Sequence, residues 1–236
     1  MARKNHIASA PSLRNSKSVE QSSAAFPDLS PKHNVPRRVL LEDQILLLDH
    51  VFTRKECSLF VRFIENQPLE LTPPKKRGEA DRLNHRLSIT SISFAQRLFA
   101  LLKPHFPDFP YPPSQKRPDA SARPAHSLNS NIRLYKYTPS QHFGPHYDDW
   151  VRDSETGAKS EWTLLIYLTG VEDGVEGGET IFYVNNQRNS SEAIIAPLMR
   201  GTALLHRHGH ECLLHEGSKV LSGIKYVLRS DVMFLG

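Results

Sequence analysis

The hydrophobic pattern divides the chain into a polar tail and a folded region. Residues 1–38 are rich in Ser, Pro, Asn and Lys and show no hydrophobic period. Such a segment cannot bury enough apolar surface to offset its conformational entropy, and we predict that it is a disordered basic tail. The folded region is then residues 39–236, which we divide into a helical support region with a Pro-rich loop at 39–128 and a β-rich core at 129–236.

The support region begins with the apolar run Ile45–Leu48, which is typical of a buried strand. Thr53 and Glu56 follow at the spacing of a capping box, in which a hydroxyl and a carboxylate bind the first free amides of a helix. They predict a helix over residues 54–66, and we expect a second helix over residues 93–105. Two helices therefore precede the core.

Two stretches of the support region predict loops. Polar residues fill the stretch from Lys75 to Arg86, and seven prolines lie between Pro104 and Pro124, where regular structure is not expected. The first stretch contains Arg82 among other basic residues. A solvated loop is one interpretation of this cluster, and a clamp for a carboxylate or phosphate on a substrate is the other.

The core consists of short β-type segments separated by turns that contain Gly, Pro or Asn. Sheets with many short strands close or stack to protect their edges. We therefore predict an α+β fold in which two helices precede a β-sandwich or a jelly-roll barrel. The predicted strands are Ile132–Tyr137, Trp162–Leu168, Glu179–Tyr183, Ala193–Ala196, Thr202–His206 and Lys225–Asp231.

The basic charge of the chain is concentrated in the tail. The first 40 residues contain seven basic and two acidic residues, which accounts for the whole net charge of +5. The rest of the chain balances 23 bases with 23 acids. The folded region therefore offers no global basic face, and nucleic acid is not an expected partner, although a local basic patch is not excluded.

Targeting signals and cysteine content bear on location. The chain has two cysteines, no secretion signal and no apolar run near the roughly 18 residues that cross a membrane. We expect no membrane association and a cytoplasmic or nuclear location. The first 18 residues lack acids and are rich in Arg, Lys and Ser, so a mitochondrial transit peptide is the alternative.

A candidate metal site starts from His146 and Asp148. The two residues stand two positions apart, so on an extended strand both side chains point to the same face and can share one metal ion. His215, in a later segment, is the candidate third ligand. Two histidines and one carboxylate form a facial triad, which leaves positions open for a chelating co-substrate and O₂ at Fe(II). The same ligands also suit Zn²⁺, so these residues leave the metal open.

A second set of residues can bind an organic acid beside that metal. Lys225 follows His215 by ten residues, and its ammonium can pair with one carboxylate. Tyr137 and Thr180 carry hydroxyls that can complete a set of charge-assisted hydrogen bonds to the same group. A metal site next to a fixed cation is the arrangement that an oxygenase with an organic-acid co-substrate requires.

Together these motifs resemble a known family. Tyr-x₈-His-x-Asp, Gly-Gly-Glu-Thr-x-Phe and His-Glu-Gly followed by Gly-x-Lys are similar to the Fe(II)/2-oxoglutarate-dependent oxygenase superfamily, in its prolyl 4-hydroxylase-like branch. The resemblance implies a double-stranded β-helix (jelly-roll, cupin-like) core with an N-terminal helical layer. It also implies a dioxygenase that releases succinate and CO₂. The implied substrate is a protein side chain, which can be that of proline, or a small molecule.

The resemblance further implies a cofactor set and residue roles. Fe(II) and 2-oxoglutarate would be the cofactors, O₂ the co-substrate and ascorbate an optional reductant. Asp231 stands where prolyl 4-hydroxylases have Trp, so proline specificity does not follow from the resemblance. The implied roles are iron binding by His146, Asp148 and His215, pairing with the distal carboxylate of 2-oxoglutarate by Lys225, and hydrogen bonding to that carboxylate by Tyr137 and Thr180.

Four further residues are candidates for contact with a substrate or with the metal ligands. We expect Trp150 at the substrate cleft and Tyr167 at the co-substrate pocket, with core packing as the alternative for both aromatics. We expect His208 to approach the metal site as a hydrogen-bond donor that does not itself bind the metal. Arg82 is the fourth. The alternative functions are a non-catalytic jelly-roll binding module that retains the metal site and a Zn²⁺ hydrolase, but neither accounts for Lys225.

Overall fold

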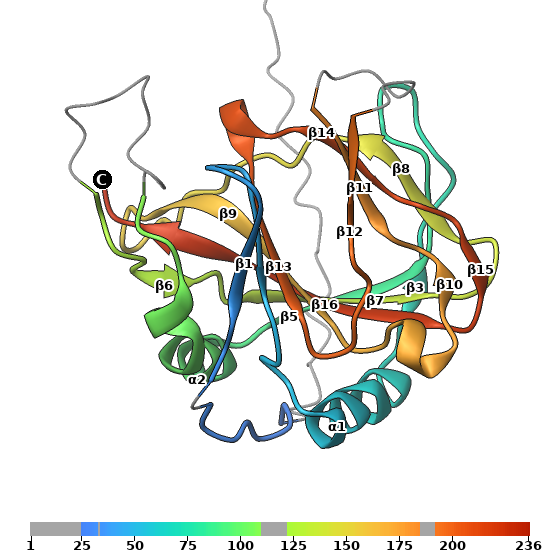
Figure 1. Ribbon diagram of the computed structural model, residues 1–236, viewed down its shortest axis with the longest axis horizontal. Helices are drawn as coiled ribbons and strands as arrows, with labels where there is room; N and C mark the ends of the chain where they lie inside the picture. Colours follow the sequence, from blue (N-terminus) through green and yellow to red (C-terminus); the bar gives the residue numbers. More distant parts are fainter. Residues whose placement is uncertain (1–24, 33, 110–121, 185–191) are drawn as a thin grey trace, which may run out of the picture.

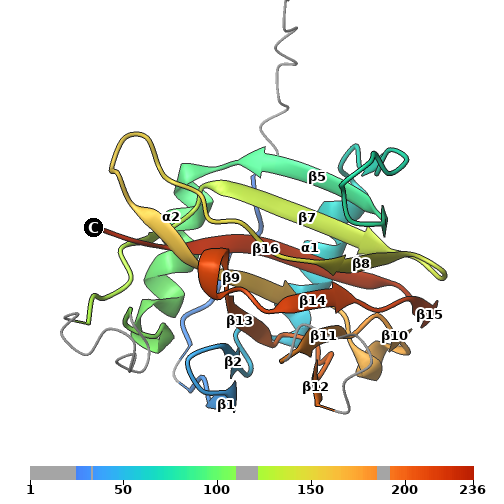
Figure 2. The same cartoon turned by 90° about the horizontal axis from the view of Figure 1, so that it is seen from above.

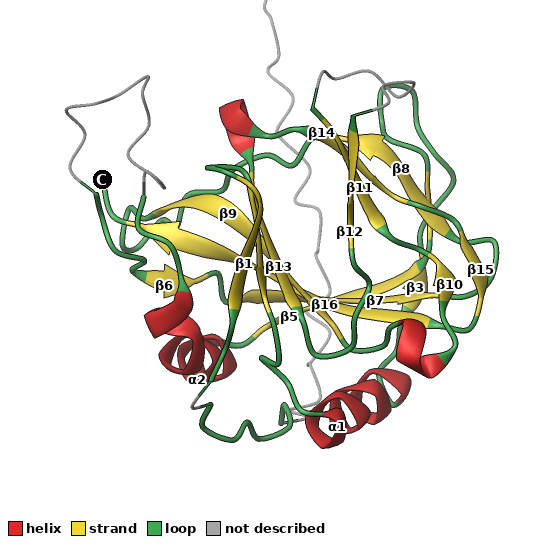
Figure 3. Ribbon diagram, viewed as in Figure 1, coloured by secondary structure: helices red, strands yellow, loops and turns green. Residues whose placement is uncertain are grey.

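Two β-sheets face each other, and two helices cover the outer face of the larger sheet (Figures 1 and 3). The structure is a computed structural model, and it describes residues 25–32, 34–109, 122–184 and 192–236. The view from above in Figure 2 shows the long strands of the larger sheet running side by side across the molecule.

The larger sheet has nine strands, in the spatial order β1-β2-β13-β9-β16-β7-β5-β3, with β6 paired to β16 outside this path. All of its pairings are antiparallel. The strand β16 lies between β9 and β7, and all ten of its residues are buried. The nine strands are β1 (Arg37–Leu41), β2 (Ile45–Leu48), β3 (Glu70–Leu71), β5 (His85–Thr90), β6 (Ser127–Leu128), β7 (Asn131–Tyr137), β9 (Lys159–Tyr167), β13 (Ala203–Arg207) and β16 (Lys225–Phe234).

The smaller sheet has five strands in the order β12-β11-β14-β8-β4, and a separate ribbon pairs β10 with β15. Two facing antiparallel sheets built from segments far apart in sequence make a double-stranded β-helix, so the predicted α+β jelly-roll fold is confirmed. The strands are β4 (Arg82–Leu83), β8 (His142–His146), β10 (Glu176–Gly177), β11 (Thr180–Tyr183), β12 (Ala193–Ala196), β14 (Leu214–Gly217) and β15 (Val220–Ser222).

The helices form where the sequence indicated. Helix α1 (Arg54–Glu65) starts with the capping box of Thr53 and Glu56, and helix α2 (Ile92–Leu102) continues into the short 3-10 helix η1 (Lys103–His105). Two further 3-10 turns are η2 (Val171–Asp173) and η3 (Gly209–Glu211). None of the helices in the described ranges is long and apolar enough to cross a membrane.

Strand β2 shows how one short apolar run serves two cores. Leu46 and Leu48 pack into the layer between the larger sheet and the helices, whereas Ile45 and Leu47 pack between the two sheets. Successive side chains of a strand point to opposite faces, so a strand that is covered on both sides is apolar throughout. All four residues are buried.

The N-terminal segment is ordered further upstream than we predicted. We expected a disordered tail through residue 38, but the Phe26 side chain stacks on Phe94 with ring centroids 4.2 Å apart, and it is 5% exposed. Lys32 pairs with the buried Glu56 at 2.5 Å, and β1 already begins at Arg37. A single aromatic residue in a polar segment gives no periodic hydrophobic pattern, so the sequence near Phe26 does not indicate that it packs against Phe94. The first 24 residues lie outside the described residues.

The predicted loop from Lys75 to Arg86 is wrong in its second half. Strand β4 starts at Arg82 and pairs with β8, and β5 starts at His85 and pairs with β7. In β5 the side chains alternate between half-buried and exposed, but the apolar inward positions, Leu87 and Ile89, come only after its polar start at His85 and Arg86, so the beginning of the strand resembles the polar loop before it. Most of the predicted Pro-rich loop, residues 110–121, lies outside the described residues.

Candidate active site

The candidate metal ligands come together on two neighbouring strands of the smaller sheet and on the segment that follows one of them. His146 ends β8, His215 lies on β14, and the two residues are opposite each other in the antiparallel pairing of these strands. Asp148 follows two residues after His146 and is 7% exposed. One ligand atom from each of the three side chains lies within 4.8 Å of the others. The sheet register therefore brings together the three residues that the sequence indicated.

The hydrogen bonds of the two imidazoles define which nitrogen faces the cluster. Nδ1 of His146 lies 2.8 Å from the Gly144 carbonyl, and Nδ1 of His215 lies 3.0 Å from the Leu213 carbonyl. Because a carbonyl only accepts, both Nδ1 atoms donate, and each Nε2 offers a lone pair. These Nε2 atoms lie 3.7 and 3.8 Å from the carboxylate oxygens of Asp148. Two neutral imidazoles and a carboxylate that face one another fit a divalent transition metal.

The ionisation states agree with that donor set. Burial, followed by the nearby His215, lowers the pKa of His146 to about 3, and burial also lowers the pKa of His215. Burial by itself would raise the pKa of Asp148, but the Arg229 guanidinium and the surrounding imidazoles hold this pKa well below its usual range. The cluster therefore contains lone pairs and one negative charge at neutral pH.

Two side chains hold the Asp148 carboxylate in place. The Thr163 hydroxyl donates to Oδ2 at 2.9 Å, and Arg229 donates to Oδ1 at 3.0 Å. His208 Nδ1 lies 3.0 Å from the Thr163 oxygen, so His208 reaches the carboxylate through Thr163. Neither Thr163 nor Arg229 was among our candidate residues. Arg229 lies four residues after Lys225 on one strand, and strand alternation could have indicated that both face inward.

His206 lies nearer to the metal ligands than His208, the histidine that we expected beside them. It is 1% exposed, and its Nδ1 lies 3.1 Å from the Arg207 carbonyl. Its Nε2 lies 3.6 Å from Asp148 Oδ2 and has no hydrogen-bond partner within the described part of the chain. The sequence showed alternating histidines at 206 and 208 but not which of them would face the cluster.

Cys212 creates a second group that can hold a metal ion, together with His206 and His215. Its sulfur accepts a hydrogen bond from the Asp148 backbone amide at 3.2 Å, and burial raises the pKa of the thiol to about 12. Metals bind the thiolate and not the thiol. The nitrogen and oxygen ligands around Asp148 are therefore the better fit for a metal ion.

A narrow cavity, which we call the inner cavity, extends from the metal ligands to Lys225 between the sheets. Lys225 is 5% exposed, and its ammonium lies 5.3 and 5.5 Å from the ring centres of Tyr137 and Tyr167. The Tyr167 hydroxyl lies 2.8 Å from the Thr180 hydroxyl. The structure thus brings together the four residues that we expected around a co-substrate, with Tyr137, Thr180 and Lys225 lining the inner cavity itself.

The charge of Lys225 fits a carboxylate ligand. Its ammonium donates to the Gly178 carbonyl, and among the described residues no carboxylate lies within ion-pair distance. Burial lowers the pKa of Lys225 to about 8, and burial raises the pKa of Tyr137 to about 12. A buried cation is costly unless it is paired. The distal carboxylate of 2-oxoglutarate would supply the missing negative charge.

Gly178 explains the Gly-Gly-Glu-Thr motif. Its φ is +78°, in the left-handed region that favours glycine. A Cβ at this position would lie 3.0 Å from Val220 Cγ2 and 3.2 Å from Lys225 Cδ. The glycine therefore lets the chain approach the lysine closely enough for its carbonyl to accept from the ammonium.

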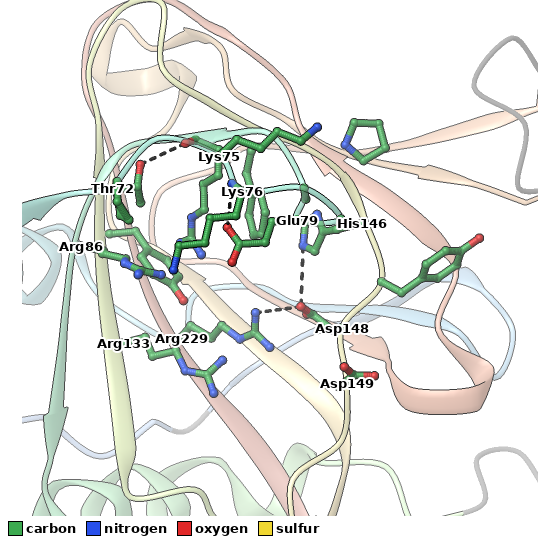
Figure 4. A pocket seen from close by; sticks show the side chains of 18 of the residues that line it. Thr72, Lys75, Lys76, Glu79, Arg86, Arg133, His146, Asp148, Asp149 and Arg229 are labelled. Atoms are coloured by element: carbon green, nitrogen blue, oxygen red, sulfur yellow. Dashed lines mark hydrogen bonds and ion pairs between the residues drawn. The ribbon is translucent and has the colours of Figure 1, made fainter. Parts of the chain in front are cut away.

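A wider opening, which we call the outer cleft, leads from the same metal ligands to the surface. Its volume is about 920 Å³, and Figure 4 shows Arg86, Arg133 and Arg229 together on one side of Asp148 within it. Arg82 lines this cleft, with its guanidinium 4.2 Å from the ring centre of Phe143. Trp150, which we expected there, is 41% exposed and lies outside the lining, whereas its neighbour Tyr147 lines the cleft.

Comparison with known proteins agrees with this geometry. Residues 132–230 match the family model of the 2OG-Fe(II) oxygenase superfamily. The fold is similar to a viral collagen prolyl hydroxylase from Paramecium Bursaria Chlorella virus-1, with a TM-score of 0.52, 16% identity, and 81% of this chain and 97% of that chain covered. It is also similar to a Pseudomonas putida prolyl-4-hydroxylase, with a TM-score of 0.51, 12% identity and coverages of 82% and 94%. No curated protein sequence matches the chain significantly.

The fold and the site together define an oxygenase that uses a mononuclear metal and an organic-acid co-substrate. The matched region, residues 132–230, is a 2OG-Fe(II) oxygenase domain, and the fold of the chain is similar to that of prolyl hydroxylases of known structure. The protein is a 2-oxoglutarate-dependent dioxygenase, with Fe(II) and 2-oxoglutarate as cofactors and O₂ as co-substrate. The alternative of a non-catalytic binding module is not favoured.

Proposed function

We propose that the protein is a hydroxylase in which His146, Asp148 and His215 bind Fe(II) and Lys225 binds 2-oxoglutarate. The reaction would convert a substrate R–H, O₂ and 2-oxoglutarate into R–OH, succinate and CO₂, so that one oxygen atom enters each organic product. The observation that carries the proposal is the buried Lys225 ammonium, which lies in the same cavity as the metal ligands and has no carboxylate partner in the described ranges.

The metal would supply the oxidation chemistry, while the chain fixes the positions of its ligands. The carbonyls of Gly144 and Leu213 hold the two imidazoles with Nε2 toward Asp148. Arg229 and Thr163 hold the carboxylate through one hydrogen bond to each of its oxygens. Hydrogen bonds between a metal ligand and its neighbours set the orientation and basicity of that ligand. We expect these four contacts to keep the site geometry fixed before a metal binds.

The inner cavity would hold the co-substrate at its far end. The Lys225 ammonium pairs with the distal carboxylate, and the protonated Tyr137 phenol and the Thr180 hydroxyl are placed to donate to it. The surrounding residues exclude water, which strengthens each of these interactions. The prime substrate would reach the metal from the outer cleft, which is open enough for a side chain on a peptide or for a small molecule.

Succinate formation tests the proposal directly. Purified protein with Fe(II), O₂ and 2-oxoglutarate should release succinate slowly without a prime substrate, because the co-substrate decomposes even when uncoupled. Zn²⁺ in place of Fe(II) should give none, which separates an oxygenase from a hydrolase. Absence of succinate in protein that binds Fe(II) stoichiometrically would contradict the proposal.

A further inference from the structure

Three arginines lie side by side on the floor of the outer cleft. Arg133 of β7 is directly opposite Arg229 of β16, and Ser88 of β5 is directly opposite Arg133. Arg86 lies two residues before Ser88 on the same face of β5. Residues on one face of neighbouring strands are close enough for long side chains to interact. The three guanidinium groups line the cleft beside Asp148 (Figure 4).

Only one of these arginines is well compensated by carboxylates. Arg229 donates to Asp148 at 3.0 Å and lies 3.5 Å from Asp231. Arg133 reaches Asp231 at 3.8 Å, and Asp231 also accepts from Asn129. For the exposed Arg86, no ion pair forms with any residue in the described ranges. Like charges opposite each other destabilise a sheet, so the row is a place where an added anion would stabilise the protein.

The loop above the arginines adds further positive charge. Lys75 and Lys76 lie over the cleft from the side opposite to the sheet (Figure 4). In total, six basic side chains line the cleft against three carboxylates. Of these three, Asp148 is a candidate metal ligand, and Glu79 accepts from the Lys76 backbone amide at 3.2 Å within its own loop. The third, Asp149, is exposed on the far side of Asp148.

Two residues of the cleft lining also carry buried donors without a partner among the described residues. The Arg82 NH2 nitrogen and the Arg229 Nε nitrogen are buried without a hydrogen-bond partner within the described part of the chain. Buried donors of this kind are uncommon and cost free energy unless a ligand or water binds them. These unpaired donors are a separate observation from the excess of basic over acidic side chains, and both belong to residues of the cleft lining.

We propose that the prime substrate carries an anionic group, a carboxylate or a phosphate, which Arg86 and Arg133 bind while a neighbouring carbon faces the metal ligands. The planar guanidinium fork binds such groups through two parallel hydrogen bonds. The group belongs either to an acidic side chain of a peptide or to a small metabolite. This inference rests on the proposed function for the position of the reacting carbon, but the anion site itself does not depend on turnover.

Direct binding tests the anion site. Hexaglutamate, hexalysine and inorganic phosphate would each be titrated into the full-length protein with Fe(II) and 2-oxoglutarate under anaerobic conditions. Hexaglutamate should bind and should weaken when the salt concentration is raised, because exposed charges are screened, and hexalysine should not bind. Phosphate that displaces hexaglutamate in the millimolar range would point to a small phosphorylated substrate, and phosphate that does not displace it would point to an acidic peptide.

Variants locate the binding to the arginine row. Arg86→Gln and Arg133→Gln should each weaken hexaglutamate binding by tenfold or more, whereas Arg54→Gln, an exposed control on α1, should leave it within twofold. The thermal midpoint of Arg133→Gln shows whether this variant still folds. The double variant Lys75→Gln and Lys76→Gln measures how much the two lysines of the loop contribute to hexaglutamate binding. Failure of both anions to bind, or unchanged binding in the arginine variants, would overturn the inference. Succinate release without a prime substrate would still report on the proposed function.

Discussion

The inner cavity and the outer cleft meet at the same three metal ligands but are built in opposite ways. Two cations line the inner cavity: Arg229 pairs with Asp148, and Lys225, with a glycine against its stem and hydroxyls beside it, has no carboxylate partner among the described residues. The outer cleft is open and contains six basic side chains from a loop and from neighbouring strands. A closed site with one uncompensated charge suits a single invariable ligand, and an open site with distributed charge suits a ligand that differs between enzymes of one fold. Variants that affect one region and not the other test this contrast.

The largest effect should follow the loss of a metal ligand, which both regions share. His146→Ala removes one of three protein ligands, so Fe(II) binding and succinate release should fall below about one thousandth of the parent values. His142→Ala, four residues earlier on the same strand, is the matched control and should keep both. Iron content after desalting and succinate release measure the two properties, and near-normal iron binding in His146→Ala would disprove the ligand assignment.

Loss of Lys225 should affect the inner cavity alone. Lys225→Ala leaves the distal carboxylate of 2-oxoglutarate unpaired in a closed space, which costs about 2–5 kcal/mol and raises the KM for 2-oxoglutarate accordingly. Lys225→Arg should retain part of the affinity, and the exposed Lys219→Ala should change nothing. Titration of 2-oxoglutarate against succinate release measures this, and an unchanged KM in Lys225→Ala would place the co-substrate elsewhere.

The pH dependence of co-substrate affinity gives a finer test. The ammonium form of Lys225 binds the carboxylate, and burial lowers its pKa to about 8. Raising the pH through 8 therefore removes the binding form, and the KM for 2-oxoglutarate should rise by about tenfold per pH unit above that value. Lys225→Arg stays charged and should show no such rise. A flat profile in the parent protein would mean that the lysine keeps its charge by another contact.

The smallest effect should come from the N-terminal segment, whose described residues contact the helices and line neither region. Removing residues 1–38 deletes the Phe26 contact with Phe94 and the ion pair between Lys32 and Glu56. Burial of one aromatic side chain contributes about 1.5–3 kcal/mol, so the thermal midpoint should fall by roughly 5–10 °C while succinate release at 25 °C persists. Phe26→Ala should reproduce most of the shift, and equal midpoints would show that this segment does not stabilise the fold.

The sequence predicted features whose signals are local. The capping box of Thr53 and Glu56, the apolar strand Ile45–Leu48 and the spacing of His146 and Asp148 are each contained within a few residues, and the structure has each element where it was expected. The assignment of metal and co-substrate ligands remains a prediction, since geometry alone does not bind a metal.

Other features depend on contacts between distant segments. The ion pair between Arg229 and Asp148 follows from the position of β16 in the sheet, and the arginine row follows from the register of three strands. The local sequence of a single strand predicts neither its position in the sheet nor its register with its neighbours. Phe26 was missed for the same reason, because its partner Phe94 is on a helix almost seventy residues later.

The central place of β16 also has a consequence for how the fold assembles. This strand joins β7 to β9 in the larger sheet, although about 90 residues separate the start of β7 from the start of β16. Closing such long loops costs entropy before any contact repays it, so folding should be slow and should pass through states with exposed strand edges. Because Lys225 and Arg229 both lie on β16, neither ligand region can exist in those states. Binding of either ligand would therefore select only chains whose sheet is complete.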